Sequence, residues 1–216
     1  MSHSMDAHDW DRRYSDSELV WSATPNQFVE AELADLSPGR AVDVATGEGR
    51  NAIWLADQGW EVTAVDFSQT GLDKGRALQS HHARGRDLHI DWVHGDVLEQ
   101  DLGVGVYDLA VLAYLQLPAD ERRTAVRRAF LSLRDGGTLF VVAHDSTNLT
   151  EGTGGPQYPE VLYTAEDILA DLDGERFEVV RAARVTREVP PPADSPEQPP
   201  RVAYDALVRV VRTNPL

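Results

Sequence analysis

The sequence predicts an α/β fold built on a mostly parallel β-sheet, and three observations support this expectation. Strand-like and helix-like patterns alternate from about residue 40 to about residue 180, which is the order of successive βαβ units. A turn of small residues follows the first strand-like segment. The last two strand-like segments are joined by "PPPADSPEQPP", which is too short and too rich in proline for a crossover helix. We therefore expect these two strands to be antiparallel neighbours.

The elements of the first half follow from the hydrophobic pattern and from residues typical of helix ends. Ser68 suits the N-cap of one helix, and Gly59 suits the position just after the end of another. The segment "LHIDWVHGD" from Leu88 alternates apolar and polar residues, as a strand does. The expected elements are a strand at 41–44, a helix at about 49–58, a strand at 62–65, a helix at about 68–83 and a third strand from Leu88.

The second half begins with "YDLAVLAYL" from Tyr107, and this apolar run is typical of a strand buried on both faces. Asp120 is expected to cap a helix, one face of which carries Ala125, Val126, Ala129, Phe130 and Leu133. After a turn at 135–137, the remaining expected elements are a strand at 138–143, a polar loop at 144–159, a helix at about 164–172 and strands at 177–189 and 201–211.

Composition and charge limit the classes of function. The 216 residues are expected to form one domain. The formal net charge of −16 repels phosphate backbones and anionic lipid, so we expect neither a nucleic-acid partner nor a membrane partner. A local group of basic residues is expected to be the solvated face of a helix; it comprises Arg122, Arg123, Arg127 and Arg128.

Several functional classes are excluded or disfavoured by what the sequence lacks. There is no cysteine, which excludes disulfides, zinc–thiolate sites and cysteine nucleophiles. No apolar run approaches the roughly 18 residues of a membrane span. The start "MSHSMDAHDW" has no apolar region of the kind found in a secretory signal. We therefore expect a cytoplasmic protein.

The turn Ala45–Gly49 lies between a predicted strand and a predicted helix. In an open parallel sheet, ligands bind at the carboxyl ends of the strands, and small residues let a ligand approach the backbone. The N-terminus of the following helix offers free N–H groups. Asp66 ends the second strand, 19 residues after Gly47, where an acid can accept hydrogen bonds from both hydroxyls of a ribose. The alternative is that the glycines only make a tight turn and that Asp66 caps the next helix.

Two kinds of cofactor fit such a turn. The segment from Gly47 to Ala52 matches G-x-G-x-x-A, a dinucleotide fingerprint. Three carboxylates favour a ligand that carries adenosine and a cation but no phosphate. Asp43 stands inside the strand, Glu48 lies within the turn, and Asp96 closes the third strand, where it can accept from the exocyclic amine of adenine. S-adenosylmethionine is such a ligand.

The chain resembles the class I S-adenosylmethionine-dependent methyltransferases over nearly its whole length from Trp10. The segment "DVATGEG", from Asp43 to Gly49, matches the family pattern D-x-[GA]-x-G-x-G. "WDRRY", "GEGRNAIWLA" and "GWEVTAVDFS" are similar to the small bacterial group related to tellurite-resistance and thiopurine methyltransferases. Many of these relatives have Gly-Cys where this chain has Ala45-Thr46, and alanine is small enough to let a ligand approach the backbone.

The resemblance implies a fold and a set of site residues. The implied fold is a Rossmann-like three-layer sandwich with a seven-stranded sheet in the order 3-2-1-4-5-7-6, whose seventh strand is antiparallel. Residues 1–39 are then a helical cap segment that folds over the cofactor, and residues 40–212 are the core. The expected cofactor-binding residues are Arg13, Asp43, Ala45, Thr46, Gly47, Glu48, Gly49, Asn51, Asp66, Phe67, Gly95, Asp96, Val97, Ala113, Tyr114 and Leu115. Trp10, Tyr14 and Trp21 belong to the cap, for which simple packing on the sheet is the alternative.

The sequence does not identify a catalytic residue. Methyl transfer from a sulfonium is an in-line displacement, and a soft nucleophile needs no base, whereas a hydroxyl usually does. His144, just past the fifth strand, is the candidate base, with Asp145 to orient it; the alternative is a histidine that only forms hydrogen bonds in a loop. The loop from His144 to Pro159 contains "EGTGGP" and is expected to close over the substrate. No metal site is expected, because the histidines at 81, 82, 89 and 94 do not converge.

These observations favour a methyltransferase that uses S-adenosylmethionine, acts on an unidentified small molecule and is a monomer or a homodimer. Two alternatives stay open. One is an oxidoreductase that uses a nicotinamide dinucleotide, and the other is a non-catalytic protein that binds S-adenosylmethionine.

Overall fold

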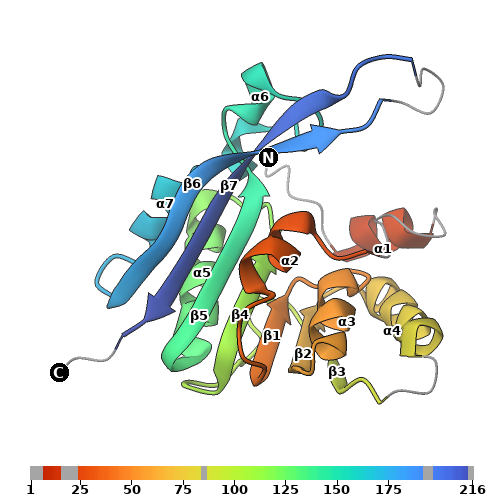
Figure 1. Cartoon of the computed structure of the whole chain (residues 1–216), viewed down its shortest axis with the longest axis vertical. Coiled ribbons are helices and arrows are strands. Elements are labelled where there is room, and N and C mark those ends of the chain that lie inside the picture. The colour runs from red at the N-terminus through yellow and green to blue at the C-terminus, as the bar shows by residue number, and fades with distance from the viewer. Residues whose placement is uncertain (1–6, 16–23, 84–86, 192–196, 214–216) are drawn as a thin grey trace.

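The structure is a computed structural model that describes residues 7–15, 24–83, 87–191 and 197–213. Trp21, one of the aromatic residues expected in the cap segment, lies outside these residues. A seven-stranded sheet forms the centre of the molecule, in the order β3-β2-β1-β4-β5-β7-β6 (Figure 1). Its strands are β1 (Arg40–Val44), β2 (Glu61–Asp66), β3 (Ile90–His94), β4 (Tyr107–Ala113), β5 (Leu133–His144), β6 (Phe177–Val189) and β7 (Arg201–Arg212).

The strand directions confirm the expected topology. The pairs β1–β2, β1–β4, β2–β3 and β4–β5 are parallel, whereas β7 runs antiparallel to both β5 and β6. The proline-rich connection therefore joins antiparallel neighbours, as its length predicts. The far end of the β6–β7 pair extends beyond the rest of the sheet (Figure 1).

Helices cover both faces of the sheet (Figure 1). Val42 and Val44 of β1 belong to a core cluster with α5 and α7, whereas Ala41 belongs to a cluster with α2 and α3, as the alternation of side chains along a strand requires. The helices are α1 (Ala7–Ser15), α2 (Gln27–Leu33), α3 (Arg50–Asp57), α4 (Gln69–Ala83), α5 (Ala119–Ser132), α6 (Asn148–Glu151) and α7 (Ala165–Asp171), with a 3₁₀ turn, η1 (Pro159–Val161).

Three local expectations need correction. Pro118, and not Asp120, is the N-cap of α5; Asp120 lies in its first turn, where a negative charge favours the helix dipole. β5 already begins at Leu133, so the residues at 135–137 belong to the strand instead of a turn before it. The expected loop at 144–159 contains the short helix α6.

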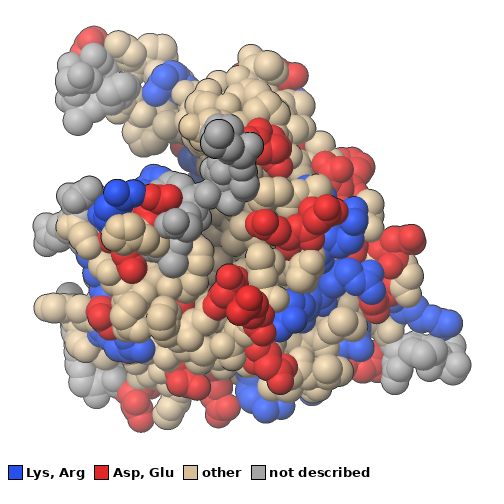
Figure 2. Space-filling model, turned by 180° about the vertical axis from the view of Figure 1, so that it is seen from behind, with Lys and Arg blue, Asp and Glu red and all other residues tan. Residues whose placement is uncertain are grey.

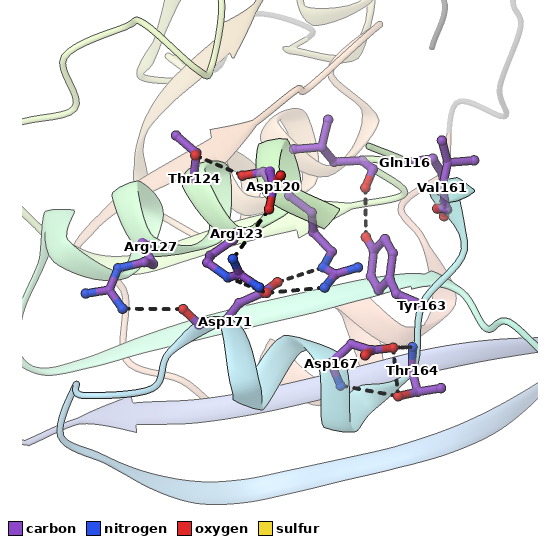
Figure 3. A network of polar contacts seen from close by, with 12 residues as sticks. Gln116, Asp120, Arg123, Thr124, Arg127, Val161, Tyr163, Thr164, Asp167 and Asp171 are labelled. Carbon is purple, nitrogen blue, oxygen red and sulfur yellow. Dashed lines mark hydrogen bonds and ion pairs between the residues drawn. The ribbon is translucent and has the colours of Figure 1, made fainter. Parts of the chain in front are cut away.

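The arginines of α5 are not a solvated basic face. Nε and Nη2 of Arg122 donate to the carboxylate of Asp171 on α7, at 2.6 and 3.2 Å, and both residues are buried. Arg127 pairs with Glu175, and Arg128 donates to backbone carbonyls of Glu99 and Gln100. Figure 3 shows Arg123 and Arg127 of α5 next to Asp171 of α7. The face of the molecule opposite to Figure 1 carries basic and acidic side chains next to one another (Figure 2).

Candidate active site

The turn after β1 has a backbone of unusual conformation. Three of its residues have left-handed φ angles, namely Ala45 at 59°, Gly47 at 59° and Gly49 at 75°. The N–H of Thr46 donates to the carbonyl of Val65, and the N–H of Gly47 donates to Oδ2 of Asp66 at 2.8 Å. These bonds tie the turn to the carboxyl end of β2. The turn therefore has a defined shape at the edge of the sheet where the sequence predicts a ligand.

The glycine at position 49 allows close packing against the ring of Trp92. A Cβ built on Gly49 would lie 2.2 Å from the ring of Trp92, and one built on Gly75 of α4 would lie 2.5 Å from the same ring. Nε1 of Trp92 donates to Oε1 of Gln79 at 2.8 Å, which holds the ring in place. Gly49 thus lets α3 begin close to β3 and α4, and its contact with the indole accounts for the absence of a side chain.

Asp43 is a buried carboxyl directly before the turn. Only 1 % of its surface is exposed, and Oδ2 accepts a hydrogen bond of 2.6 Å from the hydroxyl of Thr46. Burial raises the pKa of Asp43 to about 7, against the opposing effect of Thr46 and with a contribution from the charge of Asp66. Such a carboxyl can hold a cationic group of a ligand in its ionised form, which a neighbouring cation would favour.

Asp66 holds backbone groups with both carboxylate oxygens. Oδ2 accepts from Gly47 and Oδ1 accepts from the N–H of Ser68, each at 2.8 Å, and the residue is 4 % exposed. Burial raises the pKa of Asp66, and the two hydrogen bonds oppose that effect. A carboxylate has about four acceptor positions, so two remain for a ligand. The hydroxyl of Ser68 accepts from the N–H of Gly71, as expected of an N-cap.

Glu48 has a cationic partner within the protein. It is 2 % exposed, and its Oε1 lies 3.4 Å from Nζ of Lys74 on α4. The negative charge of Glu48 is therefore partly compensated by Lys74. Asn51 likewise has a protein partner, because its Oδ1 accepts from the N–H of Asn26, the N-cap residue of α2, at 2.9 Å.

The residues expected near adenine follow β2 and β3. Phe67 is half-buried, and its carbonyl lies 2.9 Å from Nε2 of His94. Gly95 is half-buried and Val97 is buried, whereas Asp96 is exposed and accepts from the N–H of Leu98 through Oδ1 at 2.8 Å. Asp96 is thus accessible at the end of β3, next to the strand that ends in Asp66.

Helix α1 lies beside the carboxyl edge of the sheet, next to α4 (Figure 1). Oδ1 of Asp11 accepts from the hydroxyl of Ser68 and from the N–H of Thr70, at 2.5 and 3.2 Å. Tyr14 is 4 % exposed, and Lys74 donates to its carbonyl oxygen. Arg13 is exposed, with its guanidinium 5.1 Å from the ring centre of Trp10. The helix therefore packs against α4, which begins just after Asp66 and carries Lys74, the partner of Glu48.

A second group of polar side chains lies at the ends of β4, β5, β6 and β7. We name Tyr114, His144, Arg187 and Asp205 the acceptor cluster. The hydroxyl of Tyr114 donates to Oδ2 of Asp205 at 2.9 Å, and Nε of Arg187 donates to the same oxygen at 2.9 Å. Nδ1 of His144 lies 3.3 Å from Oδ1 of Asp205. The rings of Tyr114 and His144 are 4.8 Å apart.

Asp205 and Arg187 were not foreseen from the sequence, and the expected role of Asp145 is wrong. Oδ1 of Asp145 accepts from the N–H and the hydroxyl of Thr147, at 2.9 and 2.7 Å, so Asp145 shapes the start of α6. The available signal for Asp205 was an acid in the middle of the apolar run "VAYDALV". Such a residue is rarely buried without a partner.

The neighbours of Tyr114 complete the end of β4. Ala113 and Leu115 are half-buried, and Tyr114 has a left-handed φ of 60°. The carbonyl of Leu115 accepts from the hydroxyl of Tyr163 at 2.7 Å (Figure 3). Oε1 of Gln116 accepts from the N–H of His144 at 2.9 Å. These bonds fix the segment after β4 against the segment after β5.

The described residues contain neither a candidate metal cluster nor a helix that could span a membrane. No group of three or more His, Asp or Glu side chains in this part of the chain is placed to hold a metal ion. None of the described helices has the length and apolar character needed to cross a bilayer.

The fold and the turn define an α/β domain with a nucleotide-type ligand site at the carboxyl edge of its sheet. Residues 41–137 match the protein family described as "Methyltransferase domain". The resemblance to class I S-adenosylmethionine-dependent methyltransferases is therefore confirmed for the part of the chain that contains the turn, Asp66, Asp96 and Tyr114.

Individual relatives agree with this assignment. The chain is 28 % identical over 127 residues to the tRNA 5-carboxymethoxyuridine methyltransferase of Escherichia coli strain K12, a match that covers 57 % of this chain and 48 % of that protein. The chain thus spans about half the length of the curated relatives it matches.

Solved structures show the same fold. The N-methyltransferase NodS from Bradyrhizobium japonicum, in complex with S-adenosylhomocysteine, matches with a TM-score of 0.70 at 16 % identity, over 97 % of this chain and 100 % of that chain. TehB from Haemophilus influenzae matches with a TM-score of 0.66 at 17 % identity, over 88 % of this chain and 63 % of that chain.

Proposed function

We propose that the protein is a methyltransferase that binds S-adenosylmethionine and transfers its methyl group to a small molecule. The observation that carries the proposal is the left-handed turn at Ala45–Gly49, hydrogen-bonded to Asp66 and preceded by the buried Asp43, within the segment that matches a methyltransferase family. The adenosyl cofactor supplies an electrophilic methyl group bonded to a sulfonium.

The residues of the turn and of the strand ends have the chemistry to hold such a cofactor. The two remaining acceptor positions of Asp66 suit the ribose hydroxyls. We assign Phe67 to packing against adenine and Asp96 to accepting from its exocyclic amine. Asp43 suits the α-ammonium group, directly or through water, because a cation stabilises its ionised form. Arg13 of the proposed cap segment, residues 1–39, is the candidate partner of the carboxylate.

A dinucleotide is the competing ligand. Its pyrophosphate would sit at the start of α3, where the fingerprint G-x-G-x-x-A places it. The buried carboxyls of Asp43 and Asp66 flank that position, and their charges repel phosphate. This arrangement favours a cationic ligand over an anionic one.

The small-molecule acceptor is supported by charge. With a net charge of −16, the chain has no general attraction for a polyanion, and the arginines of α5 are engaged by protein groups. The name of the Escherichia coli relative includes tRNA, so tRNA belongs among the acceptors to be tested.

Calorimetry provides the first test. The purified protein is titrated with S-adenosylmethionine, S-adenosylhomocysteine, NAD and NADP. We expect the first two to bind and the last two to give no heat of binding. Binding of a dinucleotide without binding of either adenosyl compound would overturn the proposal and favour an oxidoreductase.

A second test separates an enzyme from a sensor. The protein is incubated with S-adenosylmethionine carrying a labelled methyl group and with thiols, phenols, amines, metalloid anions and bulk tRNA. Label transferred to a small acceptor is the expected result. Binding of the cofactor without transfer to any acceptor, including a whole-cell metabolite extract, would support the non-catalytic alternative.

A further inference from the structure

The carboxylate of Asp205 organises the acceptor cluster. The residue is fully buried, and its Oδ2 already accepts hydrogen bonds from Tyr114 and Arg187. Burial raises the pKa of Asp205, but His144 and Arg187 outweigh it, so the net pKa is lowered and the group is ionised near neutral pH. The pKa of Tyr114 is raised to about 12, by burial and by the charge of Asp205. Tyr114 therefore stays protonated and donates a hydrogen bond to Asp205.

This arrangement determines which ring nitrogen of His144 carries the proton. Oδ1 of Asp205 and Nδ1 of His144 are buried and lie 3.3 Å apart, and neither atom has a hydrogen-bond partner among the described residues. A carboxylate only accepts, so the nitrogen that faces it at 3.3 Å carries a proton. In the neutral ring the other nitrogen, Nε2, then has a free lone pair. The ring lies between Tyr114 and the backbone of Gly155, and 14 % of the side chain is exposed.

The acceptor cluster lies beside the cofactor turn. β4 is the neighbour of β1, and β5 is the neighbour of β4, at about 4.8 Å for each step across a sheet. Tyr114 follows β4 and His144 ends β5, so both stand at the carboxyl edge within two strand spacings of the turn that follows β1.

We propose that His144, oriented by Asp205, is the general base for an acceptor that carries a hydroxyl group, of phenolic or enolic type. Nε2 of His144 takes the proton of the hydroxyl as the oxygen attacks the methyl carbon. The carbon–oxygen bond forms, the carbon–sulfur bond breaks, and its electron pair goes to sulfur. The products are the methyl ether, S-adenosylhomocysteine and an imidazolium next to the Asp205 carboxylate. This inference rests on the proposed function.

The chemistry of the site selects this class of acceptor. A thiol ionises more readily than a phenol, and a neutral aromatic amine attacks with its own lone pair, so neither requires a built base to the extent that a hydroxyl does. Arg187 and Asp205 compensate each other's charge, so the cluster does not favour a strongly anionic acceptor. Asp205 touches no acceptor in this scheme and is a positioning residue.

The test compares acceptors of graded acidity. Wild-type protein and His144→Gln are assayed with S-adenosylmethionine and a series of para-substituted phenols, together with the matching thiophenols. We expect kcat for the weakly acidic phenols to fall by about 10² to 10⁴-fold in the variant, with little change for 4-nitrophenol, which is already ionised. Thiophenol rates should change little. His89→Ala, an exposed histidine far from this edge, is the control.

Two additional measurements keep the outcomes distinct. Imidazole ¹⁵N NMR of the wild type should show His144 protonated on Nδ1 when neutral, and calorimetry should show the same S-adenosylmethionine Kd in wild type, His144→Gln and Asp205→Asn. Asp205→Asn should lower kcat with the same dependence on phenol acidity. If the wild type shows no measurable binding of S-adenosylmethionine, the proposed function itself is overturned.

With cofactor binding intact, several results would overturn this inference alone. These are a loss of rate in His144→Gln that is equal for all phenols, methylation of thiophenols but not of phenols, no methylation of either series, or a proton on Nε2.

Discussion

The backbone N–H of Gly47 donates a hydrogen bond of 2.8 Å to Oδ2 of Asp66, so the carboxylate that ends β2 holds the turn that follows β1. The same carboxylate also caps the start of α4 through the N–H of Ser68. The two readings of Asp66 that the sequence left open, ligand binding and helix capping, are therefore compatible. The geometry of the turn and the orientation of the proposed ribose-binding group depend on each other.

Replacing Asp66 should affect both stability and cofactor binding. Asp66→Ala leaves two buried N–H groups without a partner, each at a cost of about 1–3 kcal/mol, so we expect the free energy of unfolding to fall by about 2 kcal/mol or more. S-adenosylmethionine affinity should fall at least about tenfold, since a lost hydrogen bond to a charged group is worth about 1.5–3 kcal/mol. Urea unfolding and calorimetry measure the two effects. Asp91→Ala, an exposed acid on β3, is the control and should change stability by less than about 0.5 kcal/mol.

Position 45 should prefer glycine. Ala45 has a φ of 59°, a conformation that costs a residue with a Cβ about 1–2 kcal/mol. Ala45→Gly removes this strain but adds freedom to the unfolded chain, so we expect a gain of about 1 kcal/mol or less. Urea midpoints at unchanged m-value report the difference. The control is Ala52→Gly, within the helix α3, which should lose about 1 kcal/mol or more. Equal losses in both variants would show that Ala45 is unstrained.

Local features of the sequence predicted most of the fold. Hydrophobic period, glycine positions and the proline-rich connection each act over a few residues, and they place the turn at Ala45–Gly49 and the strands, except for the start of β5. The resemblance to a known family supplied the strand order, which is confirmed. Errors arose where several local signals compete, as at the start of α5, where Pro118 takes the capping position that Asp120 also suits.

The buried Asp43 should make stability and cofactor binding depend on pH. Its pKa is raised from 3.8 to about 7 in the folded state, so between these values the unfolded chain releases a proton that the folded chain retains. The stabilising contribution of the protonated form is therefore complete below about pH 4 and is lost as the pH rises through about 7. Asp43→Asn should gain stability relative to the wild type by a few kcal/mol as the pH rises across this range. Urea unfolding from about pH 4 to about pH 8 measures this.

The same group should couple binding to proton release. A cationic α-ammonium group favours ionised Asp43, so binding of S-adenosylmethionine near pH 6 should release a fraction of a proton. Calorimetry in buffers of different ionisation enthalpy detects it, and Asp43→Asn should abolish it. Proton release that persists in the variant would assign the effect to another group.

The pair formed by Arg122 and Asp171 should matter for stability and not for binding. Arg122→Ala leaves the carboxylate of Asp171, which is 1 % exposed, without its buried partner, and we expect a loss of about 3–5 kcal/mol. Arg123→Ala removes a half-exposed arginine near the same carboxylate and should cost less than about 1 kcal/mol. The double variant with Arg122→Met and Asp171→Leu should recover much of the loss. S-adenosylmethionine Kd should stay constant in every variant that folds.

Gly155 should control the placement of His144. A Cβ on Gly155 would lie 2.9 Å from Cγ and Nδ1 of the imidazole, so Gly155→Ala should displace the ring and lower kcat without changing cofactor Kd. Gly154→Ala is a matched control, because Gly154 has a similar φ of 71° and an added Cβ meets nothing within 4 Å. Deleting residues 152–155 should alter acceptor selectivity more than cofactor binding. Equal effects of both alanine variants would point to backbone strain alone.

The partners of Tyr114 and His144 in the acceptor cluster could not be predicted from the sequence, because Arg187 and Asp205 are distant from them in the chain. His144 and Asp205 become neighbours only because β7 pairs directly with β5, where the two residues are opposite each other. Local patterns do not reveal which strand pairs with which or in what register. Asp145, which is adjacent in the sequence, was the candidate for orienting His144, yet its side chain accepts a hydrogen bond from the N–H of Thr147.

The position of β7 has a consequence for synthesis on the ribosome. β7 follows β6 in the chain but inserts between β5 and β6, and it carries Asp205. A nascent polypeptide that has emerged as far as β5 already contains the cofactor turn and His144, yet it lacks the acid that orients the imidazole. Such an intermediate also lacks the residues that β7 contributes to both core clusters, so neither the core nor the acceptor cluster is complete until β7 has been synthesised.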